Sequence, residues 1–286
     1  MFTGALQVAE AVESGACWTS WIHKSGAPAS FGANRWCDLT MGAGTPKYNA
    51  YIGSQLTATA LQNAGNDGIY LGPNPPAGQK RYLHRWIAGT VGTSVPATVL
   101  LADYVLHYPL IDGDDTAKQV MDNTVTLPRH TTGEGLRMMA VCTTPMTANA
   151  VMTVNYTNQA GIAGRISTSA LAFNTVVGAL LSSGDTSASA NAVSPFLPLA
   201  NGDTGVRSIE SVTLTSASGG FFALVLVKPI TNIVLRETRT YRETYPLLDA
   251  SSLSSIENGA YLGMLLLTAA NGTPVTFRGA LDFVWG

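Results

Sequence analysis

The chain has 286 residues, of which 46% are hydrophobic and only 12% are charged, about half the charged share of an ordinary soluble domain. Isolated soluble domains need interspersed charges to stay dispersed, so this composition predicts that much of the surface packs against other protein. The 16 Lys and Arg against 18 Asp and Glu give a net charge of -2, and we therefore expect no direct contact with nucleic acid, which requires clustered cations.

The start of the chain does not predict a targeting segment or a membrane anchor. Residues Met1 to Leu6 lack a basic region, and Glu10 and Glu13 follow them, unlike a secretory signal. Apolar runs such as Phe221 to Val227 are far shorter than the roughly 20 residues that cross a bilayer. We expect no membrane partner, and synthesis and assembly in the cytoplasm of the host cell.

Residues 1–85 predict an extended N-terminal arm that contains a short helix. Val8, Ala11 and Val12 have helical spacing, and Gly15 follows them. A stretch rich in Gly, Ala and Trp comes next, and the arm ends near the Gly-Pro-Asn-Pro-Pro run at 72–76, which neither a helix nor a central strand would tolerate. Residues 47–64 fit a helix and a strand equally well.

Residues 86–286 predict an all-β fold of antiparallel strands, arranged as a β-sandwich or jelly roll. Met152, Val154 and Tyr156 alternate with polar residues, as half-buried strands do. Other runs, including Val99 to His107 and Phe221 to Val227, are apolar throughout, as expected of strands that are covered on both faces.

A short internal repeat predicts that the β region is duplicated. Tyr108 to Asp112 reads Tyr-Pro-Leu-Ile-Asp, and Tyr245 to Asp249 reads Tyr-Pro-Leu-Leu-Asp. Within some 30 residues, each copy is followed by a glycine turn that enters an apolar run, and the order of these features is the same in both. We therefore expect a first β unit over residues 86–172 and a second over residues 173–286.

The segment 236–245 is a charged strip in a chain that has few charges. As one strand it would place Arg236 and Arg242 on one face, and Glu237, Arg239, Tyr241 and Glu243 on the other. It fits an edge strand whose charges discourage aggregation, and equally a specific subunit contact, where Arg and Tyr are favoured anchors. The tryptophans of the arm are either buried core residues or anchors into a neighbouring subunit. The candidate interface residues are Arg236, Glu237, Arg239, Tyr241, Arg242, Glu243, Trp18, Trp21 and Trp36.

The sequence predicts neither catalytic residues nor a cofactor or metal site. The acidic run Asp112 to Asp115 lacks the spaced ligands and closing Glu of a calcium loop and fits a solvated turn better. The four histidines stand singly, and no serine lies in a GxSxG elbow. The three cysteines, Cys17, Cys37 and Cys142, fit buried thiols, and a Cys17–Cys37 or intersubunit disulfide stays open. We expect a protein that is not an enzyme.

Five segments carry a further pattern: Leu127 to Arg129, Thr132 to Gly135, Asn155 to Gln159, Gly202 to Glu210 and Val225 to Pro229. Together they resemble virion proteins encoded in the structural gene clusters of tailed bacteriophages. The resemblance covers roughly residues 100–286 and lies in the pattern of residues. It implies a structural component of a virus particle, without catalytic residues, whose partners are other virion proteins, the major capsid protein among them, and copies of itself.

The leading hypothesis is a capsid decoration or cement protein, with β domains on the shell and the arm or the charged strip bridging neighbours. A neck or tail subunit is the alternative within the same class. A tail protein that binds or depolymerises host glycans is the alternative from another class, and it would need exposed aromatic and acidic side chains that converge in a groove.

Overall fold

The computed structural model describes residues 2, 4–26, 35–63, 67–91, 95–171, 176–181, 194–249, 255–268 and 276–286. All pairings between the strands of these residues are antiparallel, and they form three sheets. Helices are few and short: α1 (Ala5–Glu13), α2 (Pro246–Asp249) and the 3-10 turn η1 (Leu39–Met41). The predicted all-β, antiparallel fold is confirmed.

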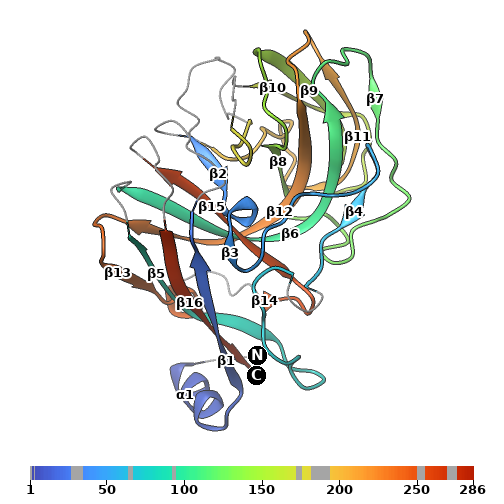
Figure 1. The fold of residues 1–286 in the computed structure, drawn as a ribbon. Coiled ribbons are helices and arrows are strands. Elements are labelled where there is room, and N and C mark those ends of the chain that lie inside the picture. The colour runs from blue at the N-terminus through green and yellow to red at the C-terminus, as the bar shows by residue number, and fades with distance from the viewer. Residues whose placement is uncertain are drawn as a thin grey trace.

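A central sheet contains the two longest strands, β6 (Ala97–Asp112) and β12 (Phe221–Leu235), which pair with each other along almost their whole length (Figure 1). Both strands are largely buried, in agreement with their apolar runs. The remaining members are β15 (Tyr261–Thr268) and β4 (Thr59–Ala60) beside β6, β2 (Trp36–Asp38) beside β15, and β8 (Arg137–Cys142) beside β12.

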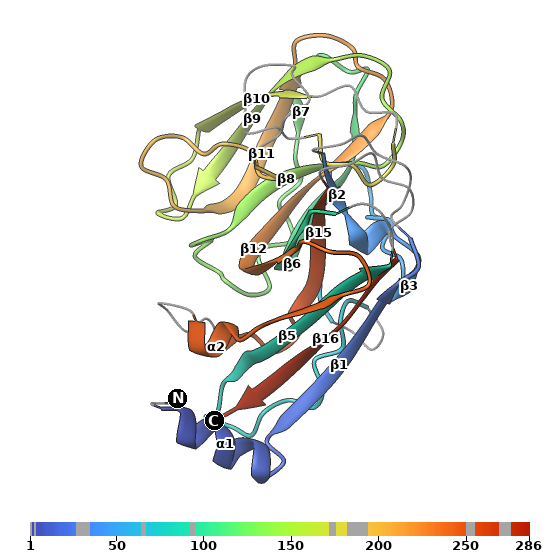
Figure 2. The same cartoon turned by 90° about the vertical axis from the view of Figure 1, so that its left-hand side faces the viewer.

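Two further sheets pack against opposite ends of these long strands, as Figure 2 shows. The terminal sheet contains the first and last strands of the chain. Its strands are β13 (Tyr241–Thr244), β5 (Arg81–Val91), β16 (Thr276–Trp285), β1 (Cys17–Lys24), β3 (Gly44–Thr45) and β14 (Ser255–Ile256). The distal sheet contains β10 (Arg165–Leu171), β9 (Ala150–Asn158), β11 (Val206–Leu214) and β7 (Gln119–Val120).

The long strands contribute to the cores at both ends. Val99 and Leu101 of β6 pack with residues of the terminal sheet such as Leu281. Tyr108 of the same strand packs with residues of the distal sheet such as Ile209. The two packed layers at each end are the arrangement of a β-sandwich, and one sheet is common to both ends.

The segment predicted as an extended arm contributes strands to two sheets. Its short helix is present as α1, but β1 pairs along its length with β16, and β2 pairs with β15. Buried and exposed residues alternate along β1, but the sequence does not show this alternation because two of the buried residues, Ser20 and Lys24, are polar. The Lys24 ammonium donates to the carbonyl oxygens of Gly42, over 3.0 Å, and Pro46, over 2.6 Å, which compensates its burial.

The two copies of the Tyr-Pro-Leu repeat have different structures. The first copy ends strand β6, whereas the second lies at the start of helix α2. The strands after the glycine turns correspond better: β8 and β15 flank the central pair of strands, and the chain then continues into β9 of the distal sheet and β16 of the terminal sheet. The four residues that the two copies share therefore do not mark a repeated structure. The units 86–172 and 173–286 stay a prediction, and the first of their boundaries falls inside β5.

Candidate subunit interface

The charged strip forms a turn followed by a short edge strand. The chain turns at residues 237–239, after β12 and before β13. Arg239 has a φ of +62°, and its backbone N–H donates to the carbonyl oxygen of Thr90 over 2.8 Å. The prediction of one continuous strand is wrong for 236–240, because the chain leaves the central sheet there and reverses to join the terminal sheet.

Strand β13 lies at the edge of the terminal sheet, next to β5. Tyr241 pairs with Gly89 and Glu243 with Ile87, so the Tyr241 and Glu243 side chains share one face of the sheet. The Tyr241 ring lies over Gly89, where an added Cβ would come within 2.9 Å of it. Arg236, Glu237, Arg239 and Arg242 are exposed as well, so all six candidates of the strip are accessible to a partner.

The three tryptophans lie in different surroundings. Trp36 is only 5% exposed and packs in the core beside the central sheet, the first of its two predicted roles. Trp18 lies on the inner side of β1, where its indole N–H donates to Ser20 Oγ over 3.0 Å. Its ring contacts the Tyr70 ring edge-on, with 5.4 Å between the ring centroids. Trp21 points from the opposite side of β1 and is 75% exposed. Of the three, Trp21 offers the largest apolar surface to a partner.

The side of the terminal sheet that faces away from the central sheet, named the outer face here, brings Trp21 and β13 together. In Figure 2 no helix or strand of the described residues covers the upper parts of β16 and β1, whereas α1 lies at their lower end. There Phe2 and Val8 pack with Tyr82 and Val284, so this end of the outer face is buried. Strand register places the outward residues in three rows: Trp21, Ala280, Ile87 and Glu243; His23, Arg278, Gly89 and Tyr241; and Thr19, Asp282 and Arg85.

Polar contacts order the lower part of the outer face. Asp282 accepts a hydrogen bond from Thr19 Oγ1 over 2.6 Å and forms an ion pair with Arg85, whose Nε lies 2.6 Å from Oδ2. The hydrogen bond to Asp282 raises the pKa of Arg85. Tyr245 donates to Glu243 Oε2 over 2.9 Å. Sequence reasoning missed Arg85, Asp282 and Thr19, because each is a single polar residue in a strand and only the register brings them together.

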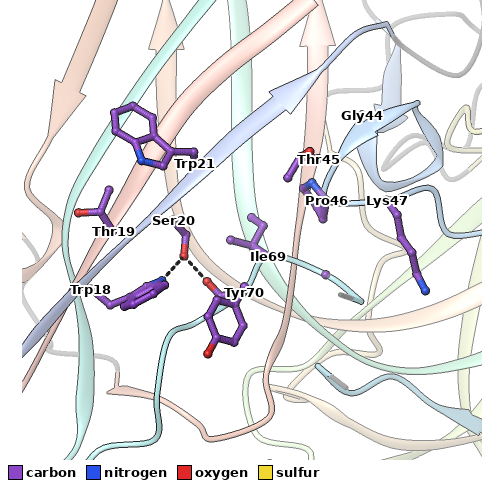
Figure 3. Close-up of a pocket in the computed structure, with 11 residues that line it drawn as sticks. Trp18, Thr19, Ser20, Trp21, Gly44, Thr45, Pro46, Lys47, Ile69 and Tyr70 are labelled. Carbon is purple, nitrogen blue, oxygen red and sulfur yellow. Dashed lines mark hydrogen bonds between the residues drawn. The ribbon is translucent and has the colours of Figure 1, made fainter. Parts of the chain in front are cut away.

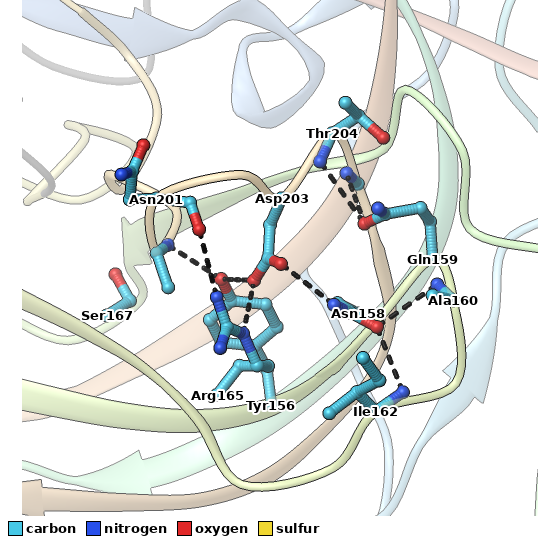
Figure 4. Close-up of polar contacts among 12 residues, drawn as sticks. Tyr156, Asn158, Gln159, Ala160, Ile162, Arg165, Ser167, Asn201, Asp203 and Thr204 are labelled. Atoms are coloured by element: carbon cyan, nitrogen blue, oxygen red, sulfur yellow. Dashed lines mark hydrogen bonds and ion pairs between the residues drawn. The ribbon is translucent and has the colours of Figure 1, made fainter.

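A second polar cluster surrounds Asp203, beside the distal sheet (Figure 4). Asp203 Oδ2 accepts from Tyr156 over 2.6 Å and pairs with Arg165 Nε at 2.9 Å, while Oδ1 accepts from Asn158 over 2.8 Å. The hydrogen bond from Arg165 lowers the pKa of Asp203 to about 2. These groups satisfy one another, so the cluster fastens the loop around Asp203 to β9 and β10.

The remaining candidates from the sequence have local roles. Asp112 and Asp115 each accept a hydrogen bond from a backbone N–H two residues further on, at 2.9 and 2.8 Å, as in Asx turns.

Among the described residues, no three His, Cys, Asp or Glu side chains are placed to bind a metal ion. The three cysteines all lie in described segments, and no disulfide joins them. In the same part of the chain, no helix has the length and apolar character needed to cross a membrane.

Comparison with known proteins gives weak matches at most. No protein-family model and no curated protein matches the chain. Among solved structures, the VP2 protein of infectious bursal disease virus, as a D431N mutant in T=1 particles, matches at 10% identity over 94% of this chain and 77% of that chain, with a TM-score of 0.18. The Gx strain of the same virus matches at 11% identity over 93% and 80%, also with a TM-score of 0.18. A TM-score this low supports no conclusion about fold or function.

Proposed function

We propose that this protein is a non-enzymatic structural subunit that assembles through the outer face of the terminal sheet. The observation behind the proposal is that Trp21 and Tyr241, 75% and 55% exposed, lie on one sheet face, in the part of it that α1 leaves uncovered. The outward positions of a solvated antiparallel sheet are usually polar. Here aromatic side chains flank Ala280 and Gly89, and Arg278 and Glu243 lie beside them.

This composition is the one that protein interfaces favour. Tryptophan, tyrosine and arginine dominate the energetics of subunit contacts, because they combine a large apolar area with polar groups. The ion pair of Arg85 and Asp282 holds the neighbouring surface in one arrangement before a partner binds. The 12% charged content of the whole chain agrees with a surface that is largely covered in an assembly.

We assign the assembly to a virus particle, with the protein as a capsid decoration or cement subunit of a tailed phage. The assignment is supported by the phage-like segments between residues 100 and 286. The proposed partners are the major capsid protein and further copies of this chain. A protein that fails to associate with purified capsids, or that is found with the tails of dissociated particles, would instead be a neck or tail subunit.

The proposed contact is tested by replacing Trp21 and Tyr241 with serine. We expect the double variant to fold and to lose cosedimentation with particles that lack the native subunit. Ile166→Ser is the matched control, since Ile166 is 56% exposed in the distal sheet, and it should bind as the wild type does. Equal binding by the double variant would remove the outer face from the interface.

A host-glycan receptor is the second candidate, favoured by the same exposed aromatic rings beside Glu243 and Arg278. Sugar rings stack on flat aromatic surfaces and bind carboxylate and guanidinium groups. Deletion of the gene separates the two functions. Loss of adsorption by stable particles supports the glycan receptor, whereas loss of particle stability with normal adsorption supports the structural subunit.

A further inference from the structure

The edge of β1 that faces away from β16 is only partly paired. β3 pairs with His23 and Lys24 alone, so in the described chain no strand lies beside residues 17–22 on that side. Trp285 donates its N–H to the carbonyl oxygen of Ala16 over 3.1 Å. With the register of β1 and β16, this bond determines which residues of β1 hydrogen-bond to β16. Even-numbered residues of β1 therefore bond to β16. Thr19 and Trp21 direct their N–H and C=O groups outward.

A groove of about 430 Å³ runs along this edge (Figure 3). One wall is β1 from Trp18 to Trp21, the end is formed by residues 44–47, and Ile69 and Tyr70 line the other side. The Ser20 hydroxyl donates to the carbonyl oxygen of Tyr70, and the Trp18 ring packs against the Tyr70 ring. These contacts hold the segment around Tyr70 in place, so the groove is preformed.

We propose that an extended segment of a neighbouring subunit adds to this edge as an antiparallel strand. Two outward N–H and two outward C=O groups, from Thr19 and Trp21, are the recognition pattern of β-strand addition. The incoming residue opposite Ser20 points toward Ile69 and Tyr70, which favours an apolar side chain there. The charged group of the groove, Lys47, is already paired with Asp67, so the fitting segment is uncharged.

The register excludes one way in which a second copy of β1 could occupy the edge. In a twofold antiparallel pair centred on Ser20, Cys17 of one copy would lie opposite His23 of the other. Thr45 already occupies the position beside His23. Because β3 occupies the edge at His23 and Lys24, the free part of the edge accommodates a tail or loop of about five residues opposite positions 18–22.

The inference deepens the proposed assembly function, and a synthetic peptide tests it independently of any particle. The probe is the capped peptide Thr-Val-Leu-Val-Thr, with leucine opposite Ser20, and its control carries N-methyl groups on both valines. Addition of the probe should shift the NMR amide signals of Thr19 and Trp21 more than that of Ser20. The methylated peptide should not bind, because it cannot donate to the edge.

Two variants at one position isolate the main-chain contact. Thr19→Val removes the hydroxyl but keeps the outward N–H, and should bind the probe as the wild type does. Thr19→Pro removes that N–H without breaking the ladder to β16, and should bind about tenfold more weakly, the effect of one lost hydrogen bond. If Thr19→Pro does not fold, the comparison of the two peptides on the wild-type protein decides.

Equal binding of both peptides, or no binding of the unmethylated one, would overturn the inference. Dimers of the wild-type protein that Thr19→Pro abolishes would identify a second copy as the occupant and also overturn it. Tyr241→Ser should still bind the peptide, since it alters only the outer face. Particle binding that depends on Trp21 and Tyr241, without any peptide binding, would refute this inference and leave the proposed function standing.

Discussion

Asp203 shows how a single carboxylate can hold a loop on the distal sheet. Asp203→Asn removes the charge that pairs with Arg165 and accepts from Tyr156, and should lower the free energy of unfolding by about 2 kcal/mol at neutral pH. The folded pKa of Asp203, about 2, lies below its ordinary value. Its stabilisation is therefore present above about pH 4 and is lost as the pH falls toward 2. Denaturant titrations over this range, with Asp115→Asn as the exposed control, measure both effects.

His107 should make the fold sensitive to mild acid. It is 2% exposed in β6, and burial lowers its pKa to about 4. An unfolded chain takes up this proton near pH 6.5, so stability falls as the pH drops from about 6.5 to about 4, by about 3 kcal/mol in all. His107→Leu should flatten that part of the pH profile. A variant with the same slope as the wild type would show that other groups cause it.

Individual residues also show where prediction from sequence fails. That Tyr241 and Glu243 share one face of the strand followed from simple alternation. The place of Lys24 did not, because a buried lysine reads as a surface residue unless its carbonyl partners, Gly42 and Pro46, are known. The pairing of Arg85 with Asp282 joins residues 197 positions apart, and only the strand register reveals it.

At the scale of elements, the turn at 237–239 and strand β13 concentrate charge beside the outer face. Arg239→Ala with Arg242→Ala should leave a folded monomer, because both side chains are exposed. Assembly should weaken by about tenfold or more, the loss expected for interface arginines. Arg207→Ala, an exposed arginine of β11, is the control, and cosedimentation with particles is the measurement. Normal assembly of the double variant would leave β13 as an edge strand whose charges only discourage aggregation.

Strands with clean alternation or long apolar runs were predictable, and those with buried polar residues were not. β9 follows the expected period of two, and β6 and β12 the expected apolar runs. β1 could not be recognised from the sequence, and the arm to which it was assigned contributes strands to the terminal and the central sheet. The Tyr-Pro-Leu repeat misled because a proline can end a strand or begin a helix, and the five residues alone do not decide which.

At the scale of the whole molecule, the continuous strands β6 and β12 should make both ends of the protein unfold together. Each end has its own core, but β6 supplies Leu101 to one and Tyr108 to the other, with β12 paired alongside. Opening one end exposes the strands on which the other end packs. A single cooperative transition is therefore expected, in spite of the two separate cores.

The five tryptophans make this testable, because they lie at positions 18, 21, 36, 86 and 285 and none is in the distal sheet. Ile209→Ala removes a buried side chain of the distal core and should cost about 2–5 kcal/mol. If the ends are coupled, the denaturant midpoint of Ile209→Ala measured by tryptophan fluorescence falls as far as the midpoint measured by far-UV circular dichroism. Leu281→Ala, in the core at the other end, should likewise lower both midpoints by the same amount. A fluorescence midpoint that stays at its wild-type value in Ile209→Ala would mean that the ends unfold independently, and that the shared strands do not transmit stability between them.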